Sequence, residues 1–415
     1  MTERMVRNPN PNRELVGSRP AFMPTVITGN VPLDAPALNF KVVGVGGAGG
    51  NVIDRLVSDQ IGNIETLAVN TDHQALRAGR ATQIVCLGEA LTRGLGAGGD
   101  PSIGQQAAEA SIGALTEALR GADLVFIAAG MGGGTGTGAA PIVAQIAREL
   151  GALTVALVTR PFAFEGRRRA QVAEQGLNQL RTIADTVIVV PNDRLLEAAA
   201  RTTTVQEAFG MADAVLRHGV QSIADIVTRH GLINVDFADV RAIMGQAGPA
   251  LLGIGVGHGP DRTAEAARRA MACPLLEGRL EGARRLLLTI TGGEDLGLLE
   301  IQRAAEIVAS LVDPDANIIF GAVIDPSFTT GQVRVTLVAT GFSLNETAPS
   351  PAPRATVAPP VPPAPKFFDQ SRTTPAPSPR PSPLPTPMAV RPFTPRPPVE
   401  DALDIPPFLQ RFGRR

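Results

Sequence analysis

The sequence has no tryptophan and no tyrosine, and its 38 Lys and Arg residues are almost balanced by 39 Asp and Glu residues. Without these aromatic side chains it lacks most of the stacking surface that single-stranded nucleic acid binders use. A net charge of -1 also provides no overall field to attract a polyanion. The composition therefore argues against nucleic acid as a partner.

Cysteine is scarce, and long apolar runs are missing. Cys86 and Cys273 lie far apart in apolar segments, and no CxxC or His/Cys spacing indicates a metal site, so we expect two buried structural thiols. The four histidines are scattered, and none is assigned to catalysis. No run of about 18 apolar residues could span a membrane, and residues 1–12 lack the apolar core of a signal peptide. We expect a cytoplasmic protein with no membrane insertion.

Both ends of the chain differ in composition from its middle. Residues 1–38 are rich in Asn, Pro and Arg and are predicted to be a disordered extension. Of the 36 prolines, 21 follow Gly341, so residues 344–399 are predicted to be a disordered spacer. Residues 400–415 regain Leu, Ile and Phe, which is typical of a short binding peptide.

The middle of the chain alternates short apolar runs with longer helical patterns. Strands are predicted at 41–46, 66–70, 83–88, 124–130, 153–159 and 186–192, and helices at 51–60, 101–120, 141–150 and 171–185. This alternation predicts an α/β domain over residues 39–203, with a Rossmann-like parallel sheet covered by helices on both faces.

A long helical pattern at 204–229 follows this domain, within a central segment 204–231. Its apolar positions form one stripe, comprising Phe209, Val215, Val220, Ile223, Ile226 and Val227. Four more strands are then predicted at 251–257, 284–293, 316–325 and 332–342, with helices at 261–272 and 298–311. We expect a second, smaller α/β domain over residues 232–343.

The stretch GMGGGTGTGAAP, residues 130–141, follows the predicted strand 124–130 and has five glycines and two threonines within 132–139. A backbone without Cβ atoms can approach a phosphate closely, and the start of a helix offers free N–H groups. Thr135 and Thr137 add hydroxyl donors. The stretch lacks the lysine of a P-loop, but it predicts an anion cradle rather than an empty turn.

Two further loops are rich in glycine. GVGGAG, residues 44–49, satisfies GxGxxG after a strand, and Asp72 is available as the acid that a nicotinamide site requires. That interpretation leaves the first cradle and the loop RGLGAGGDP, residues 93–101, without a role. Three such loops at the carboxyl ends of one sheet favour a nucleotide whose phosphates are held from several sides.

Four side chains are suited to the rest of a nucleotide. Glu165 and Arg169 in PFAFEGRRR could contact ribose and phosphate, although a solvated charged loop has the same composition. Phe209 and Asp213 lie one helical turn apart, so they could stack on a base and hydrogen-bond to it. A carboxylate suits guanine rather than adenine, while a core Phe beside a solvated Asp is the structural alternative.

Three polar residues, Asn234, Asp236 and Asp239, fall in the stretch GLINVDFADV after the long helix, where a short polar turn is predicted. Two carboxylates there could orient water or hold a cation for attack on a phosphate. A helix of roughly 26 residues would span about 40 Å, which places Phe209 and Asp236 at opposite ends. The acids therefore cannot serve the nucleotide of their own chain.

The motifs GVGGAGGN, VNTD, TRGLGAGGDP, GMGGGTGTGAAP, PFAFEGRRR, PNDRLL and NVDFADV, in this order, resemble the bacterial tubulin homologue FtsZ from about Phe40 to Phe342. The resemblance implies a GTPase that stacks head to tail, so that the turn with Asp236 and Asp239, here called the acid turn, completes the GTP site of the next subunit. Asp236 and Asp239 would then act in trans on the attacking water, supported by Asn234 and with Mg²⁺ nearby.

The same resemblance implies roles for the other motif residues. The phosphates would be held by Gly47, Ala48, Gly49, Gly50, Asn51, Gly134, Thr135 and Gly136. Glu165 and Arg169 would contact ribose and nucleotide, and Phe209 with Asp213 would contact guanine.

The resemblance also implies a cellular role. Family members form the cell-division ring at the inner face of the membrane, and the terminal stretch from Asp404 to Arg411 is similar to the peptide that binds membrane-tethering and regulatory division proteins.

Three alternatives remain open at this point. The long N-terminal extension, and His230 where the family often has proline, make a specialised paralogue with a non-septal role the first of them. The GxGxxG motif alone would suit a nicotinamide-dependent oxidoreductase, which predicts no polymer. A non-catalytic adaptor that uses its proline-rich tail would require Asp236 and Asp239 to be dispensable.

Overall fold

The computed structural model describes residues 38–342 apart from 60–63, 200–201, 229–230, 274, 276–279, 281 and 329–330. The predicted N-terminal extension, proline-rich spacer and terminal peptide lie outside these residues, as does His230.

Six parallel strands form the first part of the sheet, in the order β3-β2-β1-β4-β5-β6. Their bounds are β1 Phe40–Val45, β2 Glu65–Asn70, β3 Gln83–Cys86, β4 Leu124–Gly130, β5 Leu153–Arg160 and β6 Thr186–Pro191. Each overlaps a predicted strand. Strands β1, β4 and β5 are almost continuous buried runs, because helices cover both faces of the sheet.

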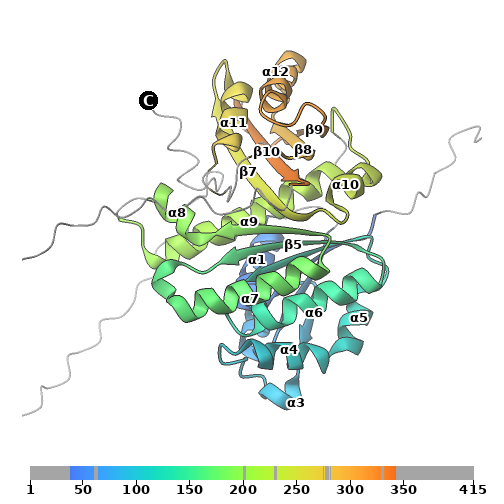
Figure 1. Ribbon diagram of the computed structural model, residues 1–415, viewed down its shortest axis with the longest axis vertical. Coiled ribbons are helices and arrows are strands. Elements are labelled where there is room, and N and C mark those ends of the chain that lie inside the picture. The colour runs from blue at the N-terminus through green and yellow to red at the C-terminus, as the bar shows by residue number, and fades with distance from the viewer. Residues whose placement is uncertain are drawn as a thin grey trace, which may run out of the picture. The chain divides into compact units, whose positions relative to one another are not determined.

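Two sets of helices cover the two faces (Figure 1). Helices α1 (Gly46–Ser58) and α9 (Val205–Thr228) share one core, which receives Val42 and Phe126 from the strands. Val43 and Ile127, the next residues along, point into the core of the opposite face. That face is covered by α4 (Pro101–Glu109), α5 (Ile112–Leu119), α6 (Thr135–Glu149) and α7 (Arg167–Ile183). The predicted parallel α/β architecture is confirmed.

The long central helix is confirmed, but its surroundings differ from the prediction. Val215, Val220 and Ile223 are buried as expected, whereas Phe209 is 40% exposed near the start of the helix. Polar side chains of α9 are buried too, namely Arg217, His218, Ser222 and Asp225. The helix packs against β5 and β6 and, on another side, against β8 and β9 of the C-terminal part of the chain. A single apolar stripe cannot cover both contacts.

The second half is a smaller α/β unit. Its elements are α10 Phe237–Met244, β7 Gly248–His258, α11 Arg262–Met271, β8 Arg285–Gly292, α12 Leu298–Ala309, β9 Asn317–Ile324 and β10 Gln332–Thr340. The strand order is β7-β10-β8-β9, and β10 runs antiparallel to both of its neighbours. Strand β7 joins the two parts into one ten-stranded sheet, because residues 248–250 pair with β6 and residues 251–258 pair with β10.

Several short elements were not predicted. These are α2 His73–Ala78, α3 Glu89–Thr92, the 3-10 helix η1 Ala163–Glu165, α8 Asn192–Ala198 and α10. The single helix predicted over 101–120 is divided between α4 and α5 near Ser111, whose hydroxyl accepts a hydrogen bond from Gly88 N at 3.0 Å. Cys273 is buried as expected, but Cys86 is only half-buried. No helix in the described ranges is long and apolar enough to cross a membrane.

Candidate nucleotide site

The strand order reverses between β1 and β4, and the glycine loops 44–50 and 130–138 follow these two strands. In open α/β sheets, ligands bind at the carboxyl ends of the strands where the order reverses. The two loops touch each other, since a Cβ built on Gly46 would lie 3.0 Å from Gly136 N. The sheet therefore brings both loops to the position where a nucleotide is expected.

The glycines of these loops fall into two groups. A Cβ on Gly49 would lie 2.3 Å from the carbonyl oxygen of Ala128, and one on Gly136 would lie 2.4 Å from that of Gly130. These glycines are required by packing inside the protein. Around Gly47, Gly50 and Gly133, in contrast, a Cβ would meet nothing within 4 Å. Packing does not require these three glycines, and open space lies beside them.

Gly134 and Ala48 complete the predicted phosphate set. A Cβ on Gly134 would lie 2.8 Å from Ala97 Cβ and 3.0 Å from Asp100 N, so this glycine lets the third loop, residues 93–100, pack against the cradle. Ala48 lies beside Gly130, since a Cβ built on Gly130 would lie 2.8 Å from the Cβ of Ala48. All three predicted loops therefore converge.

Hydroxyl groups hold the cradle in shape. Thr135 Oγ1 lies 2.7 Å from Thr71 Oγ1, and the hydroxyl of Thr137 accepts a hydrogen bond from Gly132 N at 2.8 Å. Thr71 also reaches the third loop, because its carbonyl accepts from Gly96 N at 3.0 Å. Thr71 was not among the predicted site residues, although it lies just beyond β2 at the same edge of the sheet as the glycine loops.

Asp213 lies at the other side of the site, and it is only 8% exposed. Burial raises the pKa of its carboxyl to about 6, against the opposing effects of Arg55 and of a hydrogen bond from Asn51. Arg55 Nε lies 3.9 Å from Asp213 Oδ2. Asn51, predicted among the phosphate ligands, is thus placed beside Asp213, and Arg55 is a neighbour that sequence analysis did not identify. A buried carboxylate of this kind suits a ligand that brings its own N–H donors.

Phe209 stands near Asp213 on α9 and keeps an exposed face. Its ring meets Phe162 edge to face, with centroids 5.2 Å apart, and Phe162 in turn stacks on Phe164 at 4.9 Å. Phe164 is 61% exposed. Aromatic rings fixed in this way offer a flat apolar surface to a base.

Glu165 and Arg169 are close together, as their predicted joint role requires. Glu165 Oε1 accepts from Phe162 N at 2.7 Å, and Glu165 Oε2 lies 3.2 Å from Arg169 Nη1. Arg169 packs beside the cradle, since a Cβ on Gly132 would lie 2.8 Å from Arg169 Cγ. Besides any contact to ribose, Glu165 therefore fixes the η1 turn that carries the aromatic rings.

Asn192 is a further candidate that sequence analysis missed. It follows β6 at the same edge of the sheet and is 4% exposed, and its Oδ1 atom is buried with no hydrogen-bond partner in the described part of the chain. Buried polar atoms are rarely left unpaired, so a ligand donor is expected there. Its position at the carboxyl end of a predicted strand was the available signal.

The predicted polar turn of residues 231–240 is wrong in its second half, because α10 begins at Phe237. Asp236 is the N-cap of this helix, and its Oδ1 accepts from Asp239 N at 2.8 Å. Asn234 Oδ1 accepts from Gly231 N at 2.7 Å, and Ile233 bridges to Ala322 of β9. Asn234 and Asp236 are exposed, whereas Asp239 is half-buried.

The structure does not bring these acids to the other site residues. Asp213 lies on α9 itself, and the 15 helical residues from Ala214 to Thr228, about 22 Å of helix, separate it from the turn. In Figure 1, α10 and α8 lie toward opposite ends of α9.

The fold and the cradle define a nucleotide-binding α/β protein whose loops differ from a P-loop. The profile of the Tubulin/FtsZ family GTPase domain matches residues 39–200, and that of the FtsZ family C-terminal domain matches residues 248–343. The chain belongs to the Tubulin/FtsZ family, and its first domain is a GTPase domain of that family. The match favours GTP over the nicotinamide interpretation of the GxGxxG motif.

Solved structures agree with this assignment. An empty FtsZ dimer from M. jannaschii is 45% identical, with a TM-score of 0.72 over 74% of this chain and 89% of that one. An FtsZ point mutant from M. jannaschii is also 45% identical, with a TM-score of 0.71 over 74% and 92%. CetZ2 from Haloferax volcanii, a GTPγS-bound protofilament, shares the fold at 22% identity, with a TM-score of 0.64 over 74% and 95%.

Proposed function

We propose that this chain is a self-assembling GTPase in which the acid turn of one subunit completes the GTP site of the next. The observation that carries the proposal is the length of α9, which separates Asp236 and Asp239 from the cradle of their own chain. The similar structure of an FtsZ dimer supports self-association. Hydrolysis then depends on assembly.

In this proposal Gly47, Gly50 and Gly133 leave room for the phosphates, with Thr135 as a hydroxyl donor. Phe209 stacks on guanine, Asp213 accepts from its N–H groups, and Glu165 with Arg169 contacts the ribose side. Asp236 and Asp239 orient the attacking water in trans, while Asn234 holds their turn in shape. The described residues contain no cluster of three metal-binding side chains, so we expect Mg²⁺ to be held mainly by phosphate oxygens and water.

Mixing wild-type protein with Asp239→Ala tests the shared site. The backbone N–H of residue 239 makes the helix-capping bond and alanine retains it, so the turn should stay folded. Wild type is held below the assembly threshold, where it releases little phosphate, and Asp239→Ala, inactive alone, is added to carry the mixture above it. In a head-to-tail polymer each wild-type turn then completes a GTP site on a neighbouring mutant subunit, so phosphate release per wild-type subunit should rise to the value of assembled wild type. Asp315→Ala, which changes an exposed carboxylate in the same half of the chain, should hydrolyse GTP alone at the wild-type rate.

One outcome of the mixing experiment would refute the interfacial site. If phosphate release per wild-type subunit is independent of total concentration and unaffected by added Asp239→Ala, each chain hydrolyses GTP alone and the interfacial site is refuted. Binding of a fluorescent GTP analogue to Asp239→Ala is measured in parallel, because the mixing argument requires that the mutant still binds nucleotide.

We also propose that the polymer forms the division ring, in the cytoplasm at the inner face of the membrane. The FtsZ C-terminal domain match supports this role, and the terminal stretch Asp404 to Arg411 would bind membrane-tethering partners. A fluorescent fusion should form a band at mid-cell that is lost when residues 404–411 are deleted. A band elsewhere, with normal division in cells lacking the protein, would favour the specialised paralogue instead.

A further inference from the structure

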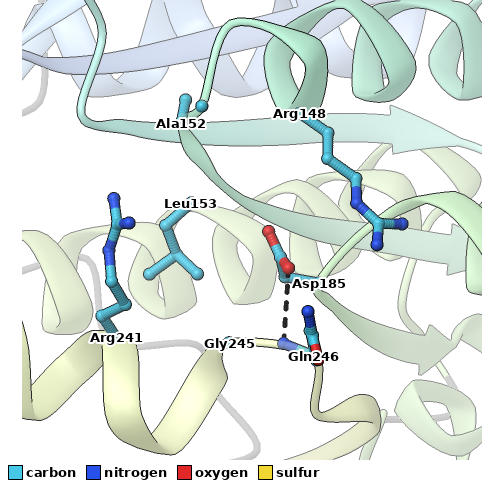
Figure 2. Close-up of a pocket in the computed structure, with 8 residues that line it drawn as sticks. Arg148, Ala152, Leu153, Asp185, Arg241, Gly245 and Gln246 are labelled. Carbon is cyan, nitrogen blue, oxygen red and sulfur yellow. Dashed lines mark hydrogen bonds between the residues drawn. The ribbon is translucent and has the colours of Figure 1, made fainter.

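A pocket lies at the edge of the sheet opposite to the glycine loops, with a volume of about 340 Å³ (Figure 2). Leu153 and Asp185 lie at the amino-terminal ends of β5 and β6, so the pocket is separate from the nucleotide site. Its lining consists of Arg148, Gly151, Ala152, Leu153, Asp185, Arg241, Gly245 and Gln246. The residues come from the first domain and from the segment around α10.

The rim of the pocket is positively charged. Arg148 and Arg241 are exposed and reach the pocket from opposite sides in Figure 2. Arg148 Nη1 donates to Ile183 O at 2.9 Å, and the guanidinium of Arg241 lies over the Phe237 ring. Within the described ranges, neither arginine is paired with a carboxylate.

The carboxylate inside the pocket does not neutralise this rim. Asp185 Oδ2 accepts from Thr154 N at 2.9 Å, and Asp185 Oδ1 accepts from Gln246 N at 3.3 Å. Both oxygens are therefore occupied by backbone N–H groups, which stabilise the carboxylate, and the two arginines of the rim still outnumber this one acid. Leu153 and Ala152 beside it are buried and expose little apolar surface, so the charged rim decides the ligand, and the pocket suits a short acidic peptide.

The described chain ends next to this pocket. Thr340 Oγ1 donates to Ile243 O at 3.0 Å, and the paired residue on β8, Arg285, donates to Gly245 O at 3.3 Å. Phe342, the last described residue, is two positions beyond Thr340. The 73 residues that follow, 343–415, therefore start beside the residues that line the pocket.

One segment of those 73 residues has the required chemistry. Of their five carboxylates, three lie within residues 400–404, in the stretch EDALD, with Leu403 between the acids. Residues 343–399, in contrast, contain six basic and two acidic side chains. A linker of that length has a root-mean-square span of about 40 Å if flexible and more if extended, so the segment can return to the pocket.

We infer that the acidic segment Glu400 to Asp404 docks in this pocket of its own chain, with its carboxylates on Arg148 and Arg241. The tether keeps the segment at a high local concentration, so a weak contact is enough to populate the docked state. The docked segment overlaps the start of the proposed partner-binding peptide at Asp404. Docking and partner binding therefore compete for the tail.

Photo-cross-linking in the full-length chain tests the inference. Leu403→p-benzoylphenylalanine is irradiated with GDP present, at a concentration below assembly, and cross-links are mapped by mass spectrometry. We expect them at residues 148–153 and 241–246. Arg148→Glu with Arg241→Glu should lower their yield roughly tenfold, the combined size of two exposed ion pairs. Adding Glu400→Arg, Asp401→Arg and Asp404→Arg to that variant should restore them.

Two controls make the result decisive. Arg194→Glu with Arg303→Glu changes the net charge equally at two exposed arginines outside the pocket lining, and it should leave the yield unchanged. Mixing isotopically heavy and light protein separates links within one chain from links between copies. Cross-links that map elsewhere, that persist in the pocket variant, or that occur only between copies would each overturn the inference.

Discussion

Replacing Asp213 by asparagine should make the nucleotide-free protein more stable while weakening GTP binding. The carboxylate is buried, and its pKa is raised to about 6 because desolvation outweighs the help from Arg55 and Asn51. The charged form is thus unfavourable in the folded chain until a ligand supplies N–H donors. Asparagine has nearly the same shape without the charge.

The size of the effect follows from the pKa. A rise from the ordinary value of 3.8 to about 6 is roughly two units, and each unit corresponds to about 1.4 kcal/mol. Because the folded pKa is the higher one, the ionised carboxylate costs nothing below pH 4, and the cost of about 3 kcal/mol is complete above pH 7. Asp213→Asn should therefore gain up to about 3 kcal/mol at pH 7.5, or about 6 °C in the melting temperature.

Thermal unfolding of nucleotide-free protein at pH 5 and pH 7.5 measures this gain, which should shrink at the lower pH. Affinity for a fluorescent GTP analogue should fall about 10- to 100-fold at pH 7.5, since a charged acceptor for two N–H donors is lost. Asp315→Asn removes an exposed carboxylate and should change neither quantity. If Asp213→Asn melts below wild type at pH 7.5, the carboxylate is a structural partner and the reasoning is refuted.

Three further predictions concern other parts of the chain. Gly49→Ala should lose about 3 kcal/mol of stability by overpacking, whereas Gly47→Ala should fold normally and bind GTP more weakly; equal urea midpoints for the two would contradict the division of the glycines. Arg262 is buried and holds Glu300 through two nitrogens, so Arg262→Met should cost roughly 3 kcal/mol. Arg262 lowers the pKa of Glu300, so the ion pair stabilises the wild-type fold above about pH 4.5 and this stabilisation is lost as Glu300 is protonated at lower pH. Arg262→Met should therefore lose less stability than wild type on acidification below about pH 4.5. An equal loss in both proteins would count against the Arg262–Glu300 pair. Gln246 has a φ of 49°, so Gln246→Gly should raise the melting temperature slightly, by the equivalent of about 0.5–1 kcal/mol, and a lower melting temperature would show that its side chain matters more than its backbone.

The sequence predicted the strands well, because β4 and β5 are apolar runs bounded by glycine, threonine and charged residues. It did not predict that α6 begins at Thr135, six residues before Pro141, since TGTG has a poor intrinsic preference for helix. Tertiary packing decides there, as a Cβ on Gly138 would lie 2.1 Å from Pro101 O. Glycine in this helix is a requirement for contact with α4.

The candidate site shows the same limit. The phosphate loops could be located because glycine after a strand has a local physical meaning. The contact of Asn51 with Asp213 could not, because it joins two helices that are distant in the chain. The role of Asp236 as a helix cap was also hidden, since the stretch NVDFADV reads equally well as a turn. Local patterns reveal backbone features, whereas side-chain partners depend on the assembled fold.

Strand β7 has a mechanical consequence for any filament that carries tension. Three residue pairs join it to β6, whereas eight join it to β10. Within the sheet, a force that pulls the two halves apart meets its weakest resistance at the short parallel seam, where few hydrogen bonds share the load. The seam would therefore open first, and the second half, held by the longer antiparallel pairing, would move as one body.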